Sequence, residues 1–385
     1  MLQVLHILSD RKFVDGHVYR FEQSGFANTY VFLKGSDVYK GKYQTKVLQV
    51  NSLNEIEKDI NTGVAYPDVI VVYNLDYPKS CLINRIDQKI PVIWYFYGTE
   101  VYSEQPFTYA IFSELTKKLL GINNLVIYYQ KLKRLGSRLK YNIINRIPTY
   151  DEVAKAMVRV NRMALFSEEE YNYLQQRSIF KLPPYMRLPV FTDDRQTLAI
   201  FPKLHDCLLL GHSASADGNH ADIIDLLTKQ EYKGQVIVPL SYGENEKYAR
   251  KIKQRLSASG LQVEILDSFI QSDQYADKIN LCQAAVFNSY RQLGLGNILL
   301  SLKNMLKVYL DEKNPSFQWL QNNGFIIFSV KKDLADNLKD GQLGLSPDQA
   351  EINRNAYHKL SDPNNNIAFL DQIKKIALSG QSIRY

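Results

Sequence analysis

The sequence has little cysteine and no long apolar run. Its three cysteines, Cys81, Cys207 and Cys282, are widely separated in 385 residues. Such spacing indicates neither a disulfide framework nor a zinc site, and it is typical of a reducing cytoplasm. No stretch reaches the ~18 apolar residues that a spanning helix needs, so an integral membrane protein is not expected. The opening apolar run has no basic residues before it, which predicts a β-strand and not a secretory signal.

Several catalytic and binding motifs are also missing. The sequence contains no nucleophile elbow, no His-Glu-x-x-His, no carboxylate cluster with metal-ligand spacing and no Asp-x-Asp pair between apolar strands. The last absence argues against a metal-dependent, single-domain glycosyltransferase, and no metal or other cofactor is expected. No RRM, KH or helix-turn-helix signature is present, so nucleic acid is not an expected partner.

The overall composition predicts a folded chain of two domains. Hydrophobic residues make up 45%, charged residues 23%, and the net charge is +7. These values are typical of globular proteins and not of disordered ones. Because a single hydrophobic core stops growing near ~250–300 residues, 385 residues indicate two cores.

The positive charge is concentrated between Leu115 and Tyr150, where no acidic residue occurs. The basic residues of this segment are Lys117, Lys118, Lys131, Lys133, Arg134, Arg138, Lys140 and Arg146. Apolar and aromatic residues lie between them, a composition suited to membrane phospholipid or a lipid-linked diphosphate. The alternative is a solvated basic helix face whose apolar side packs in the core. The sequence leaves both interpretations open.

Short apolar, β-branched runs alternate with helical segments twice along the chain. The expected strands are Leu2–Leu8, Thr29–Leu33, Lys46–Val50, Asp68–Tyr73, Pro91–Tyr97 and Met163–Phe166, then Asp206–Leu210, Gln235–Leu240, Gln262–Leu266, Ala284–Asn288, Lys307–Leu310 and Gly324–Phe328. Alternation of this kind predicts parallel sheets in an α/β fold with two doubly wound, Rossmann-like domains. We expect domains at 1–190 and 200–345, a helical tail at 346–385, and a ligand site in a cleft at the carboxyl ends of the strands.

The segment Gly211–His220, GHSASADGNH, leads from an apolar strand into a helix. Small residues allow backbone N–H groups to approach an anion, and a helix N-terminus adds positive dipole charge. The segment therefore suits a diphosphate, although it lacks the Gly-Lys-Ser/Thr ending of a Walker A loop. An ordinary turn with Asn219 as the N-cap is the alternative.

Two further loops follow predicted strands of the second half. Asn288–Asn297 contains Arg291, which could bind a phosphate bidentately, and two glycines, Gly294 and Gly296. After the next strand, Asp311 could bind ribose hydroxyls or cap the following helix. Together the loops predict a nucleoside-diphosphate pocket in the second domain.

Two carboxylates of the first half follow predicted strands. Glu100 comes after the run Trp94–Tyr97 and a glycine, and Asp10 follows the first strand. A carboxylate at such an edge could act as a general base, with Glu100 the first choice and Asp10 the second. A helix-start residue that complements the helix dipole is the alternative for each.

These strings resemble the bacterial TDP-N-acetylfucosamine:lipid II N-acetylfucosaminyltransferases, glycosyltransferase family 56. The resemblance rests on Gly211–His220, Val236–Gly260, Tyr290–Gly296, Asn314–Trp319 and the first-domain WYFYGTEVY. His212, Ser213, Asn219 and His220 match the donor loop of the family. Arg291, Gly294 and Gly296 match its glycine turn, with Asn297 following, while Tyr242 and Asn314 belong to two further matching strings. Glu100 stands where the family has Asp, and His212 replaces an Asn.

The resemblance implies a GT-B fold, in which two Rossmann-like domains face each other across a cleft. It also implies inverting, metal-independent transfer of a TDP-linked, N-acetylfucosamine-like sugar to a polyprenyl-diphosphate-linked saccharide. Such an enzyme would work as a peripheral protein at the cytoplasmic face of the bacterial inner membrane. Alternatives are a GT-B transferase with a soluble acceptor, a sugar-nucleotide epimerase, and a non-catalytic glycan- or anion-binding protein.

Overall fold

The computed structural model describes residues 1–35, 38–104, 106–129, 132–133, 149–190, 206–243, 246–268 and 270–381. The chain divides into two compact units that are not contiguous in sequence. Unit 1 is Met1–Pro106, Gln130–Phe191 and Asp362–Tyr385, and unit 2 is Phe107–Tyr129 and Thr192–Ser361.

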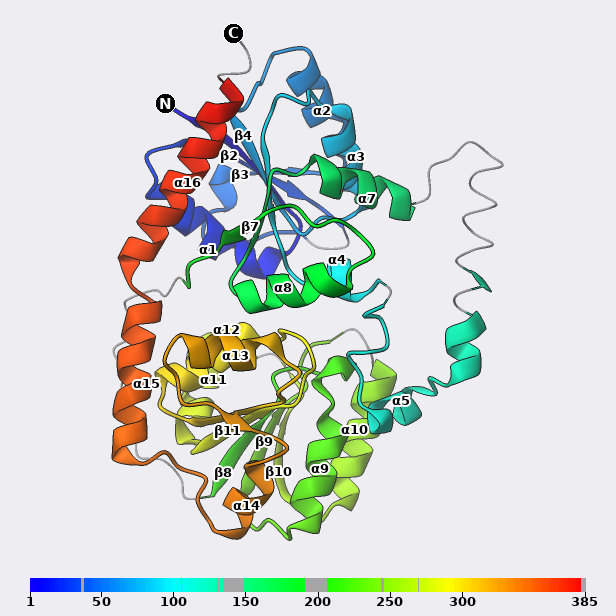
Figure 1. Ribbon diagram of the computed structural model, residues 1–385, viewed down its shortest axis with the longest axis vertical. Coiled ribbons are helices and arrows are strands. Elements are labelled where there is room, and N and C mark those ends of the chain that lie inside the picture. Colours follow the sequence, from blue (N-terminus) through cyan, green and yellow to red (C-terminus); the bar gives the residue numbers. More distant parts are fainter. Residues whose placement is uncertain are drawn as a thin grey trace. The chain divides into compact units, whose positions relative to one another are not determined.

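Unit 1 contains a seven-stranded parallel sheet (Figure 1), in the order β3-β2-β1-β4-β5-β6-β7. Its strands are β1 (Gln3–Leu8), β2 (Ala27–Leu33), β3 (Val47–Val50), β4 (Val69–Tyr73), β5 (Val92–Tyr95), β6 (Arg162–Leu165) and β7 (Tyr185–Arg187). The sequence order reverses on either side of β1 and β4, which pair in parallel with Val4 opposite Val69. This is the switch point at which doubly wound sheets bind ligands.

Helices cover both faces of this sheet (Figure 1), which explains why the central strands β4 and β5 are apolar and buried throughout. The helices of unit 1 are α1 (Arg11–Glu22), α2 (Asn54–Asn61), α3 (Tyr77–Arg85), α4 (Thr99–Tyr102), α7 (Thr149–Arg159), α8 (Glu168–Arg177) and α16 (Pro363–Gln381). On one face, Phe21 of α1 and Phe369 and Ile373 of α16 share a buried core with Val71 of β4. Elsewhere α3 packs against α7.

Unit 2 contains a six-stranded parallel sheet in the order β10-β9-β8-β11-β12-β13. Its strands are β8 (Cys207–Leu210), β9 (Gln235–Pro239), β10 (Gln262–Leu266), β11 (Ala284–Phe287), β12 (Lys307–Leu310) and β13 (Phe328–Ser329). The helices are α5 (Glu114–Leu120), α9 (His220–Lys229), α10 (Glu246–Ala258), α11 (Ser272–Leu281), α12 (Leu295–Lys303), α13 (Pro315–Asn322), α14 (Leu334–Lys339) and α15 (Pro347–Leu360).

The structure confirms the predicted fold class of two parallel α/β domains but differs from the expected bounds. Residues 107–129 of the expected first domain belong to unit 2. The region 346–385 is not a separate tail, because α15 packs on α12 of unit 2 and α16 packs on β4 of unit 1. The proline-bearing region after residue 183 also contains an unpredicted strand, β7, which pairs with β6.

Candidate active site

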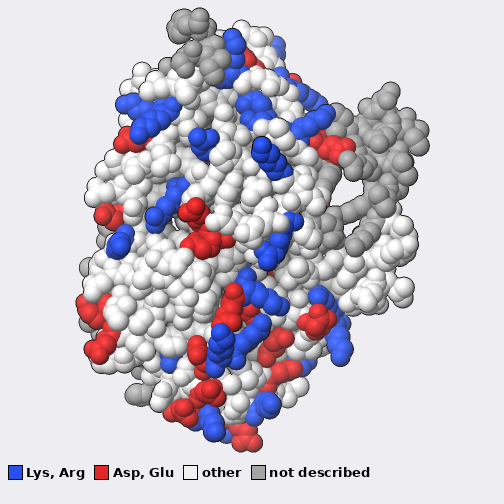
Figure 2. All heavy atoms as spheres, in the orientation of Figure 1, with Lys and Arg blue, Asp and Glu red and all other residues white. Residues whose placement is uncertain are grey.

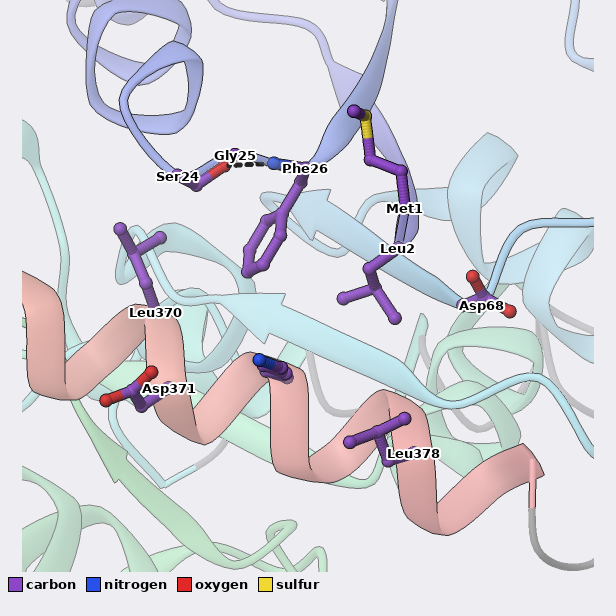
Figure 3. A pocket seen from close by; sticks show the side chains of 10 residues that line it. Met1, Leu2, Ser24, Gly25, Phe26, Asp68, Leu370, Asp371 and Leu378 are labelled. Carbon is purple, nitrogen blue, oxygen red and sulfur yellow. Dashed lines mark hydrogen bonds between the residues drawn. The ribbon is translucent and has the colours of Figure 1, made fainter.

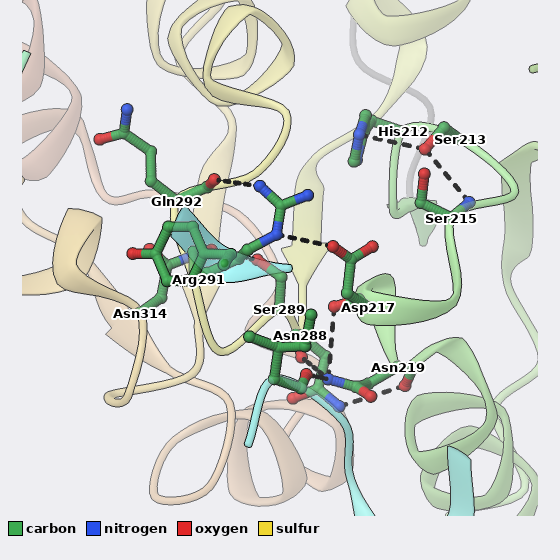
Figure 4. A network of polar contacts seen from close by, with 12 residues as sticks. His212, Ser213, Ser215, Asp217, Asn219, Asn288, Ser289, Arg291, Gln292 and Asn314 are labelled. Atoms are coloured by element: carbon green, nitrogen blue, oxygen red, sulfur yellow. Dashed lines mark hydrogen bonds and ion pairs between the residues drawn. The ribbon is translucent and has the colours of Figure 1, made fainter. Parts of the chain in front are cut away.

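The three loops singled out in the second half follow neighbouring strands of unit 2. The strand pairs β8–β11 and β11–β12 are both parallel, so their carboxyl ends lie at one sheet edge. The loops that begin at Gly211, Asn288 and Asp311 therefore meet there (Figure 4). The structure brings together the side chains that the sequence predicted for a donor site.

Gly211 and His220 form the buried base of the first loop. Gly211 has φ +71°, and a Cβ at this position would collide with the His220 ring, so only glycine fits. His220 is fully buried, and its Nδ1 lies 3.2 Å from the Tyr248 hydroxyl, while Nε2 has no hydrogen-bond partner. Burial lowers the pKa of His220 to about 4, which keeps the ring neutral. The His220 ring thus packs against the backbone of the loop at Gly211 and Gly218.

The side chain of Asn219 makes hydrogen bonds to backbone groups of three segments of unit 2. Its Nδ2 donates to the carbonyls of Asn288 at 3.0 Å and Ile111 at 3.2 Å, and its Oδ1 accepts from Ser113 N at 2.8 Å. Asn219 occupies the N-cap position of α9, as the alternative interpretation expected, but with φ 49° and no capping hydrogen bond from its side chain. Its amide is thus a connector between two loops and the segment that precedes α5.

The buried ion pair between Arg291 and Asp217 occupies the centre of the site (Figure 4). Arg291 Nε donates to Asp217 Oδ2 at 2.7 Å, and the two side chains are 9% and 10% exposed. Arg291 Nη1 also donates to the Gln292 carbonyl at 3.2 Å. The pair joins the loop that leads into α12 to the loop that leads into α9 and holds the guanidinium plane in place.

His212 and Ser213 line the same loop beside Gly294. Ser213 Oγ lies 3.1 Å from His212 Nε2, and the two residues are 0–7% exposed. A Cβ on Gly294 would lie 2.6 Å from His212 Cγ, so glycine is required for the two loops to pack together. Gly294, with φ 68°, is also the N-cap of α12.

The first turn of α12 carries Gly296 and Asn297. A Cβ on Gly296 would meet no atom within 4 Å, so space is open next to this turn. Asn297 Oδ1 accepts from the Tyr275 hydroxyl at 2.5 Å. Tyr242 is half-exposed, and its ring lies edge-on to that of His212 with centroids 6.2 Å apart. An N-terminal turn with open space and polar neighbours is suited to an anion.

Asp311 and Asn314 behave differently from each other. Asn314 is the N-cap of α13: its Oδ1 accepts from Ser316 N at 2.9 Å, and its Nδ2 donates to Ser289 Oγ at 3.0 Å. Asp311 is 1% exposed, and its Oδ2 makes no hydrogen bond but lies 3.4 Å from Lys331 Nζ. Asn314 shapes the loop, whereas Asp311 keeps a buried oxygen at the strand end.

In unit 1, Glu100 lies at the carboxyl edge of the sheet but its carboxylate is enclosed. Oε1 accepts from Trp94 Nε1 at 3.1 Å, Leu75 N at 3.2 Å and Tyr97 N at 3.3 Å. Oε2 is buried without a hydrogen-bond partner. Burial raises the pKa of Glu100, against the effect of these N–H donors. Glu100 was expected to be accessible, but its carboxylate is enclosed and links the chain after β4 to the chain after β5.

Asp10 is the more accessible of the two expected carboxylates. It is the N-cap of α1, where Oδ1 accepts from Lys12 N at 3.2 Å, and its side chain is 37% exposed. A buried cation supports this edge: Lys79 Nζ donates to Ser9 Oγ at 2.7 Å and Asp76 Oδ2 at 2.6 Å. Lys79 thereby holds Ser9, the residue that precedes Asp10, in place.

A separate hollow of about 500 Å³ lies in unit 1, between α16 and the start of β1 (Figure 3). It is lined by Met1, Leu2, Ser24, Gly25, Phe26, Asp68, Leu370, Asp371, Lys374 and Leu378. Six of these residues precede β1, β2 or β4 and the other four lie on α16, so the hollow is at the amino edge of the sheet. It is distinct from both carboxyl-edge clusters.

Sequence reasoning missed Asp217, Ser289, Ser113 and Lys79. For Asp217 the sequence did contain a signal, because an acidic residue is unexpected in a loop that is predicted to bind an anion. Ser113 had none, because it lies 106 residues before Asn219, whose side chain it contacts. Within the described ranges, no three His, Cys, Asp or Glu residues are grouped as metal ligands. Within those ranges, too, no helix is long and apolar enough to cross a membrane.

Several solved structures share the architecture of this chain. Sucrose-phosphate synthase from Thermosynechococcus elongatus matches with a TM-score of 0.66 at 11% identity, covering 100% of both chains. HepE of Anabaena, in complex with UDP and glucose, matches at 0.59 with 12% identity, covering 98% and 100%. WaaG, a glycosyltransferase involved in lipopolysaccharide biosynthesis, matches at 0.57 with 12% identity, covering 97% and 99%. The fold is GT-B.

The family follows from the sequence itself. Residues 129–352, more than half of the chain, match the model of the family described as 4-alpha-L-fucosyltransferase, glycosyl transferase group 56. The chain belongs to this family and is a glycosyltransferase that uses a nucleotide-sugar donor. The predicted family and enzyme class are confirmed.

Proposed function

We propose that the chain transfers an N-acetylfucosamine-like sugar, a 4-acetamido-4,6-dideoxygalactose, from a TDP-linked donor to a polyprenyl-diphosphate-linked saccharide with inversion. The product would belong to a bacterial surface polysaccharide of the enterobacterial common antigen type. The observation that carries the proposal is the buried Arg291–Asp217 pair, because it holds a guanidinium in the loops that lead into α9 and α12.

The leaving nucleoside diphosphate would be stabilised by the Arg291 guanidinium and the first turn of α12. Arg291 supplies a planar donor fork, and the N-terminal turn of α12 supplies backbone N–H groups and dipole charge. Donors fixed in place before the reaction need no reorganisation when charge develops on the leaving oxygen. This chemistry requires no metal in the proposal, so turnover should be unaffected by EDTA.

We assign the general base to Asp10 and not to the first-choice Glu100. A base must come within hydrogen-bonding distance of the acceptor hydroxyl. Asp10 is 37% exposed, whereas the Oε2 of Glu100 is buried and its Oε1 is held by three N–H groups. Glu100 in this account keeps the ends of β4 and β5 in register.

A lipid-linked acceptor places the enzyme at the cytoplasmic face of the inner membrane as a peripheral protein. The acid-free segment 115–150 supports this location, since each Lys or Arg near an anionic surface contributes ~1 kcal/mol. Lys117, Lys118 and Lys133 lie in the part of the chain that the structure describes. Lys131, Arg134, Arg138, Lys140 and Arg146 lie outside the described residues.

The test is a donor and acceptor screen. Thermal shift and calorimetry with TDP-, UDP- and GDP-linked sugars identify the donor, and NMR of the product gives its anomeric configuration. We expect the TDP-linked 4-acetamido sugar to bind best and to be transferred with inversion to the lipid-linked acceptor. Efficient transfer to a soluble saccharide would replace the lipid acceptor, and donor binding without release of nucleoside diphosphate would indicate a non-catalytic protein.

A further inference from the structure

An exposed apolar surface follows α5 in unit 2. A helical segment, residues 124–129, starts after Asn123, whose Oδ1 accepts from Val126 N at 2.9 Å. Leu125 is 78% exposed, and Tyr128 and Tyr129 are exposed by 63% and 64%. We refer to these three side chains as the apolar patch. Residues 122–129 contain no charged residue, and Figure 2 shows their surface without charge colours.

The patch differs from the other exposed apolar residues of the described chain. Side chains such as Val64, Val158, Ile179 and Ile352 are exposed singly, as is normal for soluble proteins. The three residues of the patch fall within five positions of the helical segment 124–129, at the spacing i, i+3 and i+4 of one helix face. Exposed apolar groups gathered in this way indicate an interaction surface.

The segment that carries the patch is fastened to unit 2 by buried polar contacts. Ser113 N donates to Asn219 Oδ1 at 2.8 Å, and Ser113 Oγ donates to Asp222 Oδ2 at 2.6 Å. Further along, the Leu119 carbonyl accepts from Lys251 Nζ of α10. Leu115 and Leu119 of α5 also pack on the core of unit 2. The patch therefore extends from the donor-binding unit, although its sequence lies in the first half of the chain.

We propose that the apolar patch inserts into the lipid bilayer and holds the donor-binding unit at the membrane. This inference rests on the proposed function and sharpens it, because the proposed basic contact by itself specifies neither insertion nor the unit that inserts. Leucine buries in acyl chains, while tyrosine has an apolar ring and a hydroxyl suited to the headgroup level. The flanking acid-free sequence complements anionic headgroups.

A second copy of the chain is a poorer fit to this surface. A stable interface between proteins buries roughly 800 Å² on each partner. Three partly exposed side chains supply at most about half of that area, given that one aromatic side chain covers at most ~150–250 Å². A bilayer needs no matching shape and accepts a patch of this size. The net positive charge of the flanking sequence also disfavours contact between two identical surfaces.

Co-sedimentation with vesicles tests the inference on the full chain. The test variant carries Leu125→Ser, Tyr128→Ser and Tyr129→Ser, and the matched control carries Val64→Ser, Val158→Ser and Ile179→Ser. We expect the test variant to lose at least about ten-fold in partitioning to phosphatidylglycerol-containing vesicles. The control should bind like the parent. Equal binding of test variant and parent, or no binding by the parent, would overturn the inference.

Insertion itself is measured with Leu125→Trp, since both native tryptophans, Trp94 and Trp319, are buried. We expect a blue shift with vesicles and quenching by brominated acyl chains, both retained near 1 M salt. A salt-sensitive signal without quenching would show electrostatic adsorption only, and loss of dimers in the test variant without loss of vesicle binding would show a protein interface. Either result overturns insertion. Turnover with the nucleotide sugar and a soluble acceptor analogue, measured in parallel, distinguishes failure of insertion from failure of the proposed transferase.

Discussion

Arg291 donates through Nε to Asp217 Oδ2 at 2.7 Å, and both side chains are about nine-tenths buried. A carboxylate thus lies beside the one arginine that sequence analysis selected for a diphosphate. The pair is electrically neutral, so Asp217 limits the net charge of the site while it fixes the orientation of the guanidinium. Removing either partner alone leaves the other as a buried, unpaired charge. Substitution of Arg291 is therefore expected to lower stability as well as donor binding.

Arg291→Ala is expected to weaken donor binding by roughly 2–5 kcal/mol, because a buried charge contact to the diphosphate is lost. It should also lower the free energy of unfolding by roughly 3–5 kcal/mol, since Asp217 stays buried and unpaired. Adding Asp217→Asn should restore most of the stability but none of the donor affinity. Calorimetry and denaturant unfolding of the single and double variants measure the two effects. Donor affinity that returns with stability would remove Arg291 from the site.

Asp10→Asn should lower turnover by ~10²-fold or more with nucleotide binding retained, because it removes a base without changing its size. Asparagine is as good an N-cap as aspartate, so α1 should be unaffected. Glu100→Gln is the comparison: it should cost roughly 1–3 kcal/mol of stability through a weakened buried network, with a smaller effect on turnover. Steady-state kinetics and thermal unfolding decide between them. The reverse pattern would restore Glu100 as the base.

His220 should make unit 2 sensitive to acid. Its pKa is about 4 in the folded chain against 6.5 when unfolded, so below pH 6.5 the unfolded state binds a proton that the folded state does not. Stability therefore falls as the pH falls from 6.5 to 4, by up to roughly 3 kcal/mol from this residue. We expect His220→Gln to reduce the difference in unfolding free energy between pH 7 and about pH 5. His358→Gln, at an exposed position, is the control and should leave that difference unchanged.

Charge removal in the basic segment should weaken membrane contact in a salt-dependent way. Changing Lys131, Lys133, Arg134 and Arg138 to Gln should reduce binding to anionic vesicles at low salt. The difference from the parent should disappear near 1 M salt, where the Debye length is ~3 Å. Sedimentation at both salt concentrations, with neutral vesicles as the reference, provides the measurement. Equal binding to neutral and anionic vesicles, unaltered by the changes, would leave these residues as a solvated surface.

The pattern of apolar runs predicted the sheets well because buried parallel strands cannot be built from other residues. Lys307–Leu310, which is buried throughout, has the bounds that the sequence predicts, and so has the less buried edge strand Gln262–Leu266. The second-half site was also predictable in part, since Gly211, Arg291 and Gly294 follow adjacent strands. Tyr185–Arg187 was missed because three residues between prolines carry too little periodicity to indicate a strand.

Side-chain partners could not be predicted in the same way. Glu100 and Asp10 both follow apolar strands, and nothing in the sequence distinguishes an enclosed carboxylate from an accessible one. The contact of Asn219 with Ser113 depends on a segment that leaves one unit and packs on the other. Such pairings depend on how distant parts of the chain meet, which local periodicity does not encode.

The path of the chain between its two units affects how relatives of this enzyme can be recombined. Unit 1 is assembled from three stretches of sequence and unit 2 from two, with changes at Pro106/Phe107, Tyr129/Gln130, Phe191/Thr192 and Ser361/Asp362. A single crossover near residue 190 would give a chimera whose residues 107–129 meet a foreign α9, and whose α16 covers a foreign β4. Exchange of donor specificity between homologues therefore requires 107–129 and the donor half to be transplanted together, with α16 left with its own sheet.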